Sequence, residues 1–139
     1  MKKTLSIVSL LLCLAMLTAC GGGAVPDGLW KDAIHTEDIT LGTGATTVTV
    51  EVKAGDTAID ITLKTDKTVL GDALLEHNLI AGDQGAYGMY IKAVNGITAD
   101  YDIDQSYWAF YKNGEMMMTG VDGTNIADGE HYELVYTKS

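Results

Sequence analysis

The chain has 139 residues, 47% of them hydrophobic, and a formal net charge of −10. This length accommodates one domain behind a leader segment and is too short for two domains. The negative charge argues against binding to nucleic acid or to an anionic lipid surface, because both need Lys and Arg partners.

The first residues have the pattern of a bacterial export signal. Lys2 and Lys3 form a positive start, and the apolar segment Leu5–Leu17 is too short to span a bilayer as a stable helix. Small residues stand directly before Cys20, and this run, Leu17-Thr18-Ala19-Cys20, resembles the cleavage site of lipoproteins. The resemblance implies that residues 1–19 are removed, that Cys20 carries a diacylglyceryl thioether, and that the protein is anchored at the extracellular face of the cytoplasmic membrane. An uncleaved membrane anchor or a buried helix is the alternative interpretation.

Glycine residues follow this cysteine and indicate a flexible tether over residues 20–29. Loss of Lys2 and Lys3 with the leader takes the net charge from −10 to −12. Cys13 is also lost and Cys20 is modified, so the domain predicted for residues 30–139 has no free thiol and no disulfide. The folded part must therefore be held together by its core alone.

Alternating apolar residues predict strands in the first half of this domain. Ile39 and Leu41 suggest a short first strand. Residues 47–52 alternate strictly, and residues 59–63 alternate again after a turn at Ala54-Gly55-Asp56. The two longer segments predict a β-hairpin.

One helix is predicted after this hairpin, over residues 67–77. Asp66 is suited to cap its N-terminus, and the apolar residues of the segment fall on one stripe. Asn78 is expected to end the helix in a left-handed conformation. His77 in the last turn complements the helix dipole, and a ligand role for it is the alternative.

Further strands are expected after a loop at Gly82–Gly85. Residues 87–94 lead to the turn Asn95-Gly96, and residues 107–112 lead to Asn113-Gly114. Asn-Gly between apolar alternations is a strong hairpin signal, because both turn residues need positive φ. With a last strand at residues 132–136, the order predicts an α+β fold: a mostly antiparallel β-sheet with a single helix, β-grasp-like in its order ββαβββ.

Asp100, Asp102 and Asp104 have a spacing that invites a calcium interpretation. An EF-hand loop also needs glycine at its sixth position and a bidentate glutamate at its twelfth, where this chain has Gln105 and Tyr111. An irregular cation site and a solvated acidic loop between two strands both remain open.

Catalytic chemistry finds little support in the sequence. The three histidines are scattered without metal-ligand spacing, and no nucleophile elbow is present. We therefore predict a non-enzymatic protein with no catalytic residues, no metal ligands and no cofactor.

Aromatic residues between positions 87 and 111 form the most informative cluster. Alternation assigns Trp108 and Phe110 to the core and leaves Tyr107 and Tyr111 partly exposed on the other face of their strand. Exposed tyrosines supply flat amphipathic contact area for a ligand, although a cross-strand pair that only stiffens the sheet is equally compatible. Met116-Met117-Met118 follows nearby. These side chains are expected only to fill space on an edge strand; an adaptable apolar binding site is the alternative.

Several short motifs in the order of this chain resemble a known family. They are Thr65-Asp66-Lys67, Leu70-Gly71-Asp72-Ala73-Leu74-Leu75, Tyr87-Gly88-Met89-Tyr90-Ile91, Val94-Asn95-Gly96, Tyr107-Trp108-Ala109-Phe110, Gly120-Val121 and Asp128-Gly129-Glu130-His131-Tyr132. From about Thr47 to Thr137 the chain resembles the transcobalamin-like C-terminal domain of small bacterial surface lipoproteins, a family without an established function.

The resemblance implies a ligand face. In the vertebrate cobalamin carriers the related β domain closes over one face of the corrinoid, and a helical barrel, absent from this chain, covers the other. The segment Tyr107-Trp108 matches the strand that leads toward that face, although Ala109 stands where the carriers have glutamine. We therefore expect a binding module that takes a small molecule, with a corrinoid and a partner protein implied, at Tyr107, Tyr111, Trp108 and the Tyr87-Gly88 loop. A protein–protein or cell-wall interaction module without a small ligand is the alternative. A concave pocket beside the tyrosines favours the first, whereas a flat patch or an unpaired edge strand favours the second.

Overall fold

The computed structural model describes residues 28–86 and 88–139. The predicted leader, the lipidation site at Cys20 and most of the predicted tether therefore lie outside the described residues, as does Tyr87. Within the described part of the chain, no helix has the length and hydropathy that crossing a membrane requires.

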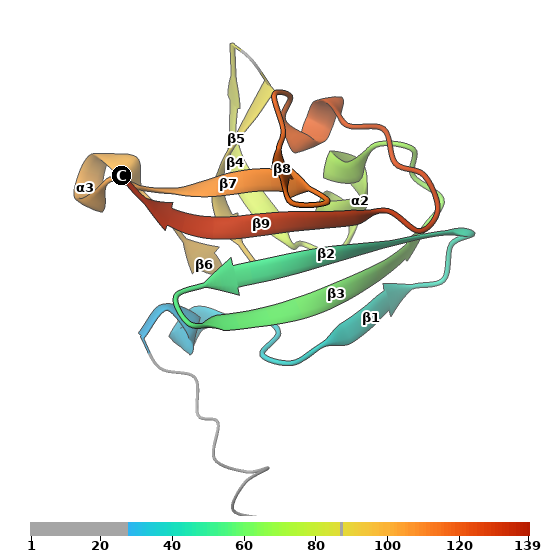
Figure 1. Ribbon diagram of the computed structural model, residues 1–139, viewed down its shortest axis with the longest axis horizontal. Coiled ribbons are helices and arrows are strands. Elements are labelled where there is room, and N and C mark those ends of the chain that lie inside the picture. The colour runs from blue at the N-terminus through green and yellow to red at the C-terminus, as the bar shows by residue number, and fades with distance from the viewer. Residues whose placement is uncertain (1–27, 87) are drawn as a thin grey trace, which may run out of the picture.

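A six-stranded mixed sheet forms the larger layer of the fold (Figure 1). Its order is β1-β3-β2-β9-β7-β8, with parallel pairing of β1 with β3 and of β2 with β9 and antiparallel pairing elsewhere. The strands are β1 (Ile39–Gly42), β2 (Thr46–Ala54), β3 (Thr57–Thr65), β7 (Ser106–Lys112), β8 (Glu115–Met116) and β9 (His131–Lys138). The predicted first strand, the first hairpin and the last strand are thus confirmed.

A second, antiparallel sheet has the order β4-β5-β6, formed by β4 (Ile80–Gly85), β5 (Gly88–Val94) and β6 (Ile97–Thr98). The prediction of a loop at Gly82–Gly85 is wrong, because these residues pair with β5 along the whole hairpin. Residues of β4 after Ile80 are exposed, so no apolar alternation marks the strand. Its pairing comes from backbone hydrogen bonds alone.

The Asn-Gly turns have the geometry that hairpins of two-residue loops need. Asn95 and Gly96 have φ values of 53° and 80°, and Asn113 and Gly114 have 51° and 82°. These turns join β5 to β6 and β7 to β8, so the two strongest turn predictions are confirmed.

The main helix is α2 (Leu70–Glu76), three residues shorter at its start than predicted. Asp66 does not cap it, since its carboxylate accepts a hydrogen bond from the Ala45 amide at 3.0 Å. Val69 takes the N-cap position instead and bridges to Asn125. Because Val69 pairs with a residue distant in the chain, the helix begins only at Leu70. At its other end Asn78 has the expected left-handed φ of 56°.

Three shorter helical turns complete the fold, namely η1 (Gly28–Asp32), α3 (Tyr101–Asp104) and η2 (Val121–Gly123). Trp30 in η1 is buried, and its indole Nε1 donates to the Ala54 carbonyl at 2.9 Å. The N-terminal end of the described chain is thereby fixed to the β2–β3 hairpin.

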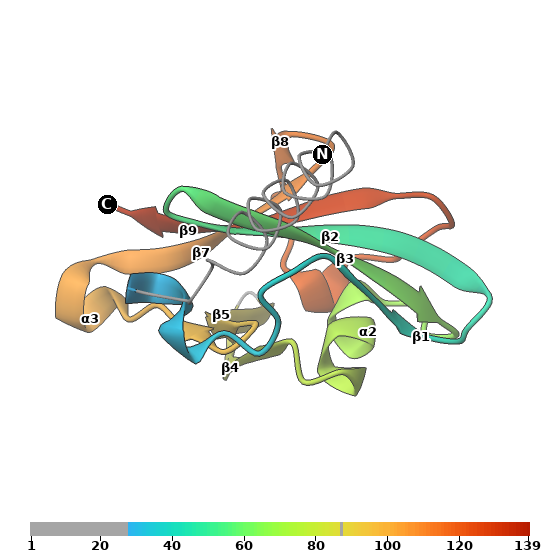
Figure 2. The same ribbon diagram turned by 90° about the horizontal axis from the view of Figure 1, so that it is seen from below.

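The core lies on one side of the large sheet, where α2 and the smaller sheet cover the same face (Figure 2). The alternating valines of β2 and the buried side chains of β3 and β9 meet the buried side of α2, as alternation and helical periodicity predict. The architecture is thus a mostly antiparallel α+β fold with one main helix. The chain passes from β6 of the smaller sheet through α3 into β7 of the larger sheet, and the site described next lies at this junction.

Candidate functional site

A cavity of about 640 Å³ lies between the β4–β5 hairpin, α3 and the start of β7. Its volume is in the range of small-molecule sites. Three tyrosines, three aspartates, one lysine and one alanine line it: Asp83, Tyr90, Lys92, Ala99, Asp100, Tyr101, Asp102 and Tyr107. Residues distant in the sequence therefore converge on one concavity.

The tyrosines come from three different elements. Tyr90 belongs to β5, Tyr101 to α3 and Tyr107 to β7. The rings of Tyr101 and Tyr107 lie 6.5 Å apart and are inclined at 54°. Tyr90 and Tyr101 are 44% and 46% exposed, so their rings offer surface to a bound molecule rather than to the core.

The hairpin wall carries a paired lysine. Asp83 lies opposite Tyr90 in the β4–β5 register, and its carboxylate Oδ2 is 3.0 Å from the Lys92 Nζ. The hydrogen bond and charge of Asp83 raise the pKa of Lys92, and the charges of Asp100 and Asp102 add to this effect. Lys92 is therefore charged but locally compensated, and the cavity as a whole carries an excess of negative charge.

The Asp-x-Asp-x-Asp segment, for which the sequence left a cation site and an acidic loop open, forms a single helical turn. The Asp100 carboxylate accepts from the Asp102 amide at 3.0 Å and caps the N-terminus of α3, which ends at Gln105 with a left-handed φ of 60°. This turn places Tyr101 against Tyr107. Asp100 thus has a local structural role as the N-cap of this turn.

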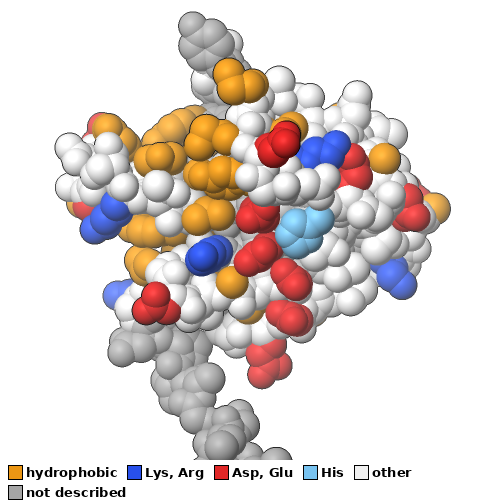
Figure 3. All heavy atoms as spheres, in the orientation of Figure 1, with side chains coloured by type: hydrophobic (Ala, Val, Ile, Leu, Met, Phe, Trp, Pro, Cys, Tyr) orange, Lys and Arg blue, Asp and Glu red, His pale blue; other side chains and the backbone are white. Residues whose placement is uncertain are grey.

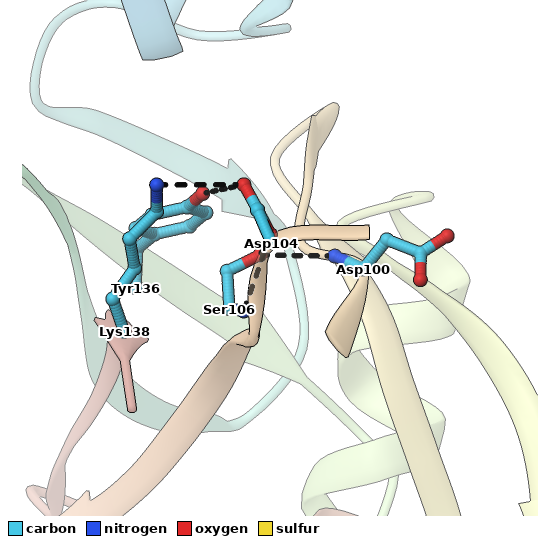
Figure 4. A network of polar contacts seen from close by, with 5 residues as sticks. All are labelled: Asp100, Asp104, Ser106, Tyr136 and Lys138. Carbon is cyan, nitrogen blue, oxygen red and sulfur yellow. Dashed lines mark hydrogen bonds and ion pairs between the residues drawn. The ribbon is translucent and has the colours of Figure 1, made fainter. Parts of the chain in front are cut away.

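Asp104 fastens this turn to the large sheet (Figure 4). Its carboxylate accepts hydrogen bonds from the Ser106 hydroxyl and amide, and it lies 3.4 Å from the Tyr136 hydroxyl and 3.6 Å from the Lys138 Nζ. These contacts, led by the Ser106 hydroxyl, lower the pKa of Asp104. The network holds the Tyr101 wall in place. No group of three or more metal-ligating side chains occurs in residues 28–86 and 88–139.

The other residues expected at the site lie in different places. Trp108 is 7% exposed, and its Nε1 donates to the Ile97 carbonyl at 3.1 Å. It lines a smaller neighbouring cavity of about 150 Å³, which shares Tyr90 and Tyr107 with the larger one. Tyr111 lies on the same side of β7 as Tyr107 and is likewise half-buried, but it does not line the 640 Å³ cavity. The structure thus brings Tyr107 and Trp108 close to one ligand-sized concavity and leaves Tyr111 outside it.

Gly88 begins β5 with φ of 111°, and the following amide, that of Met89, donates to the Asp122 carboxylate at 3.0 Å. A side chain at Gly88 would meet Asp122 Oδ1 at 2.7 Å. Gly88 therefore joins the hairpin to η2 and does not line either cavity.

Five lining residues were not predicted from the sequence to have a binding role, namely Asp83, Tyr90, Lys92, Ala99 and Tyr101. Tyr90 and Tyr101 belong to the aromatic cluster, which was the available signal. Their convergence depends on β4 and α3, which the sequence pattern did not reveal.

The surface separates apolar from acidic side chains. Figure 3 shows hydrophobic side chains gathered on the side where β7 and α3 lie, and acidic side chains in a band across the large sheet. In that sheet Glu51 lies opposite Asp60 of β3 and Glu133 of β9. Met116 and Met118, 60% and 95% exposed, lie at and just beyond the edge strand β8.

The fold and the cavity define a small α+β domain with two sheets and a tyrosine-lined cavity at their junction. Residues 66–138 match the model of a family described as a domain of unknown function, DUF4430. The match covers more than half of the chain, and the protein belongs to this family. No curated protein matches the chain.

Solved structures similar to it include the following two. One is a protein from Ruminococcus gnavus, provisionally described as metal-binding, with 36% sequence identity and a TM-score of 0.65, over 68% of this chain and 99% of that chain. The other is haptocorrin in complex with Cbi, with 20% identity and a TM-score of 0.51 over 70% of this chain. This second match spans only 26% of haptocorrin, so it shows a shared fold in one part of a larger protein.

Proposed function

We propose that this protein is a lipid-anchored, extracellular, non-catalytic binding module that captures a small molecule in the tyrosine-lined cavity. The observation that carries the proposal is the convergence of Tyr90, Tyr101 and Tyr107 on one open cavity of about 640 Å³. Apolar rings with a few convergent polar groups are typical of ligand sites. The similarity to haptocorrin, whose structure was solved in complex with Cbi, also supports the proposal of a small-molecule site.

A corrinoid held together with a partner protein is the specific ligand that we propose. Tyr90 and Tyr101 are partly exposed to solvent, so a flat macrocycle resting on these rings would leave its other face for a second protein. A corrinoid also brings its own cobalt. Such a ligand fits the metal-binding description of the Ruminococcus gnavus relative without a cluster of protein ligands, which the described residues lack.

Binding is tested with the detergent-solubilised protein, titrated with cobinamide and with cobalamin by absorbance and calorimetry. We expect Tyr107→Ala to weaken binding about tenfold or more, because truncation of a central aromatic contact costs on the order of 2 kcal/mol. Tyr111→Ala is the matched control on the same strand and outside the cavity lining, and it should bind as the unaltered protein does. Equal losses in the two variants would refute the cavity as the site.

A protein-interaction module is the second candidate function, and one observation favours it. Ile103, Met116 and Met118 are 81%, 60% and 95% exposed, which is unusual for large apolar side chains and typical of contact surfaces. Binding of a surface protein that is insensitive to Tyr107→Ala but lost on Met118→Ser would favour this function.

The proposed membrane anchor depends on Cys20. Cys20→Ala is expected to block processing or to release the protein from membranes, because two acyl chains on this residue would supply the stable attachment. Fractionation of cells and a detergent partition assay measure the effect. Unchanged partition of the variant would show that the chain is retained by other means.

A further inference from the structure

We infer that the tyrosine-lined cavity selects organic cations: it binds ligands that combine an apolar body with a positive charge. This inference rests on the proposed function and names the chemical class of ligand for the same site. It starts from the ionised groups around the cavity, which are the carboxylates of Asp83, Asp100 and Asp102 and the ammonium of Lys92.

The single positive charge in the lining is already matched. Lys92 Nζ lies 3.0 Å from the Asp83 carboxylate, so this pair presents little net charge to a ligand. The carboxylates of Asp100 and Asp102 remain, and both are near enough to raise the pKa of Lys92. An anionic ligand would therefore meet two uncompensated negative charges.

The remaining carboxylates have spare acceptor capacity. One oxygen of Asp100 accepts the Asp102 amide. In the part of the chain that the structure describes, the Asp102 carboxylate accepts no hydrogen bond and forms no ion pair. A ligand ammonium would supply the missing donors, and a hydrogen bond between charged groups is stronger than one between neutral groups.

The aromatic walls favour the same charge. A cation within about 6 Å of a tyrosine ring centroid is attracted by the negative face of the ring. Tyr101 and Tyr107, 6.5 Å apart at 54°, stand beside Asp100 and Asp102 in the same cavity. Rings and carboxylates thus act together on a positive group, whereas a neutral sugar would gain from the rings alone.

The test uses three ligands with the same indole body and different charge: tryptamine, tryptophol and indoleacetate. They are titrated into the detergent-solubilised protein at low ionic strength, with calorimetry as the readout. We expect tryptamine to bind about tenfold more tightly than tryptophol. This difference in affinity is the gain from one cation–π contact and one charged hydrogen bond, partly offset by desolvation of the ammonium group. Indoleacetate should bind more weakly than tryptophol.

Two variants assign the preference to named groups. The double variant Asp100→Asn, Asp102→Asn keeps the N-cap of α3, because asparagine caps as well as aspartate, and it should remove most of the difference between tryptamine and tryptophol. Asp72→Asn, on the exposed side of α2, changes the net charge of the whole protein by one unit, and the tryptamine preference should survive it.

Equal affinity for tryptamine and tryptophol, or a preference that survives in the double variant, overturns the inference. Cobinamide binding at Tyr107 without any tryptamine preference would also overturn it while leaving the proposed function intact. If neither the indole series nor a corrinoid binds, both the inference and the proposed function fail.

Discussion

Replacement of Tyr132 by alanine is expected to lower the free energy of unfolding by about 4 kcal/mol. Tyr132 is fully buried in β9, where it lies between Val50 of β2 and Lys112 of β7 in the strand register. Its ring stacks on Phe110 at 5.9 Å. Since small domains are stabilised by only about 5–15 kcal/mol, this variant should unfold at a much lower urea concentration, monitored by the fluorescence of the buried tryptophans.

Tyr132→Phe separates the ring from its hydroxyl group. The hydroxyl donates to the Glu130 Oε1 at 2.6 Å, and burial first, then this bond and the charge of Glu130, raise the pKa of Tyr132. Removal of the hydroxyl should cost about 1.5 kcal/mol, because Lys112 and the Ala127 amide still satisfy the carboxylate. A loss in the alanine variant no larger than in the phenylalanine variant would contradict a role of the ring in the core.

The hairpins of this fold follow from local chemistry, which is why the sequence predicts them. The Asn95-Gly96 and Asn113-Gly114 turns need positive φ at both residues, and asparagine and glycine adopt it at little cost. In β2 and β3 the strict alternation of apolar side chains matches the buried face observed. The residues that determine these turns and strands are therefore close together in the sequence.

Other elements depend on partners distant in the chain. β4 has no apolar alternation and exists because β5 pairs with it. The start of α2 is set by the bridge of Val69 to Asn125, which no local capping rule anticipates. Parallel pairing of β9 with β2 joins the two ends of the domain, so a pattern of turns does not reveal the order of strands in the large sheet.

In the candidate site, too, some features follow from local sequence and others depend on partners distant in the chain. Alternation along one strand predicted that Tyr107 is partly exposed, as the structure has it. Alternation says nothing about which other residues approach it, and the partners Tyr90 and Tyr101 arrive through the β4–β5 hairpin and α3. The tyrosine cluster in the sequence thus indicated a surface, but the cavity also needs residues of β4, β5 and α3 that approach β7 only in the folded chain.

Replacement of Gly82 by alanine is expected to disrupt the hairpin wall of the cavity and to destabilise the protein by about 3 kcal/mol. Gly82 lies in β4 directly after the register shift, opposite Ile91 of β5. A Cβ atom there would be 2.0 Å from the Tyr90 carbonyl oxygen. Backbone atoms of a paired strand have little room to yield, so β4 and β5 must separate, which moves Asp83 away from Lys92 and displaces Tyr90.

Gly123→Ala is the matched control, because the nearest atom to a Cβ there is Thr119 Cβ at 3.8 Å and the backbone is not in the left-handed region. Its stability should change by less than about 1 kcal/mol. Urea unfolding measures both variants, and ligand titration shows whether the wall survives. Because β4 pairs with the rest of the fold only through β5, Gly82→Ala should lose ligand affinity at urea concentrations well below those that unfold the large sheet. A Gly82→Ala variant that is destabilised yet binds ligand normally would show that binding does not need the β4–β5 hairpin in this position. Binding would then depend on Tyr101 and Tyr107 and not on Tyr90.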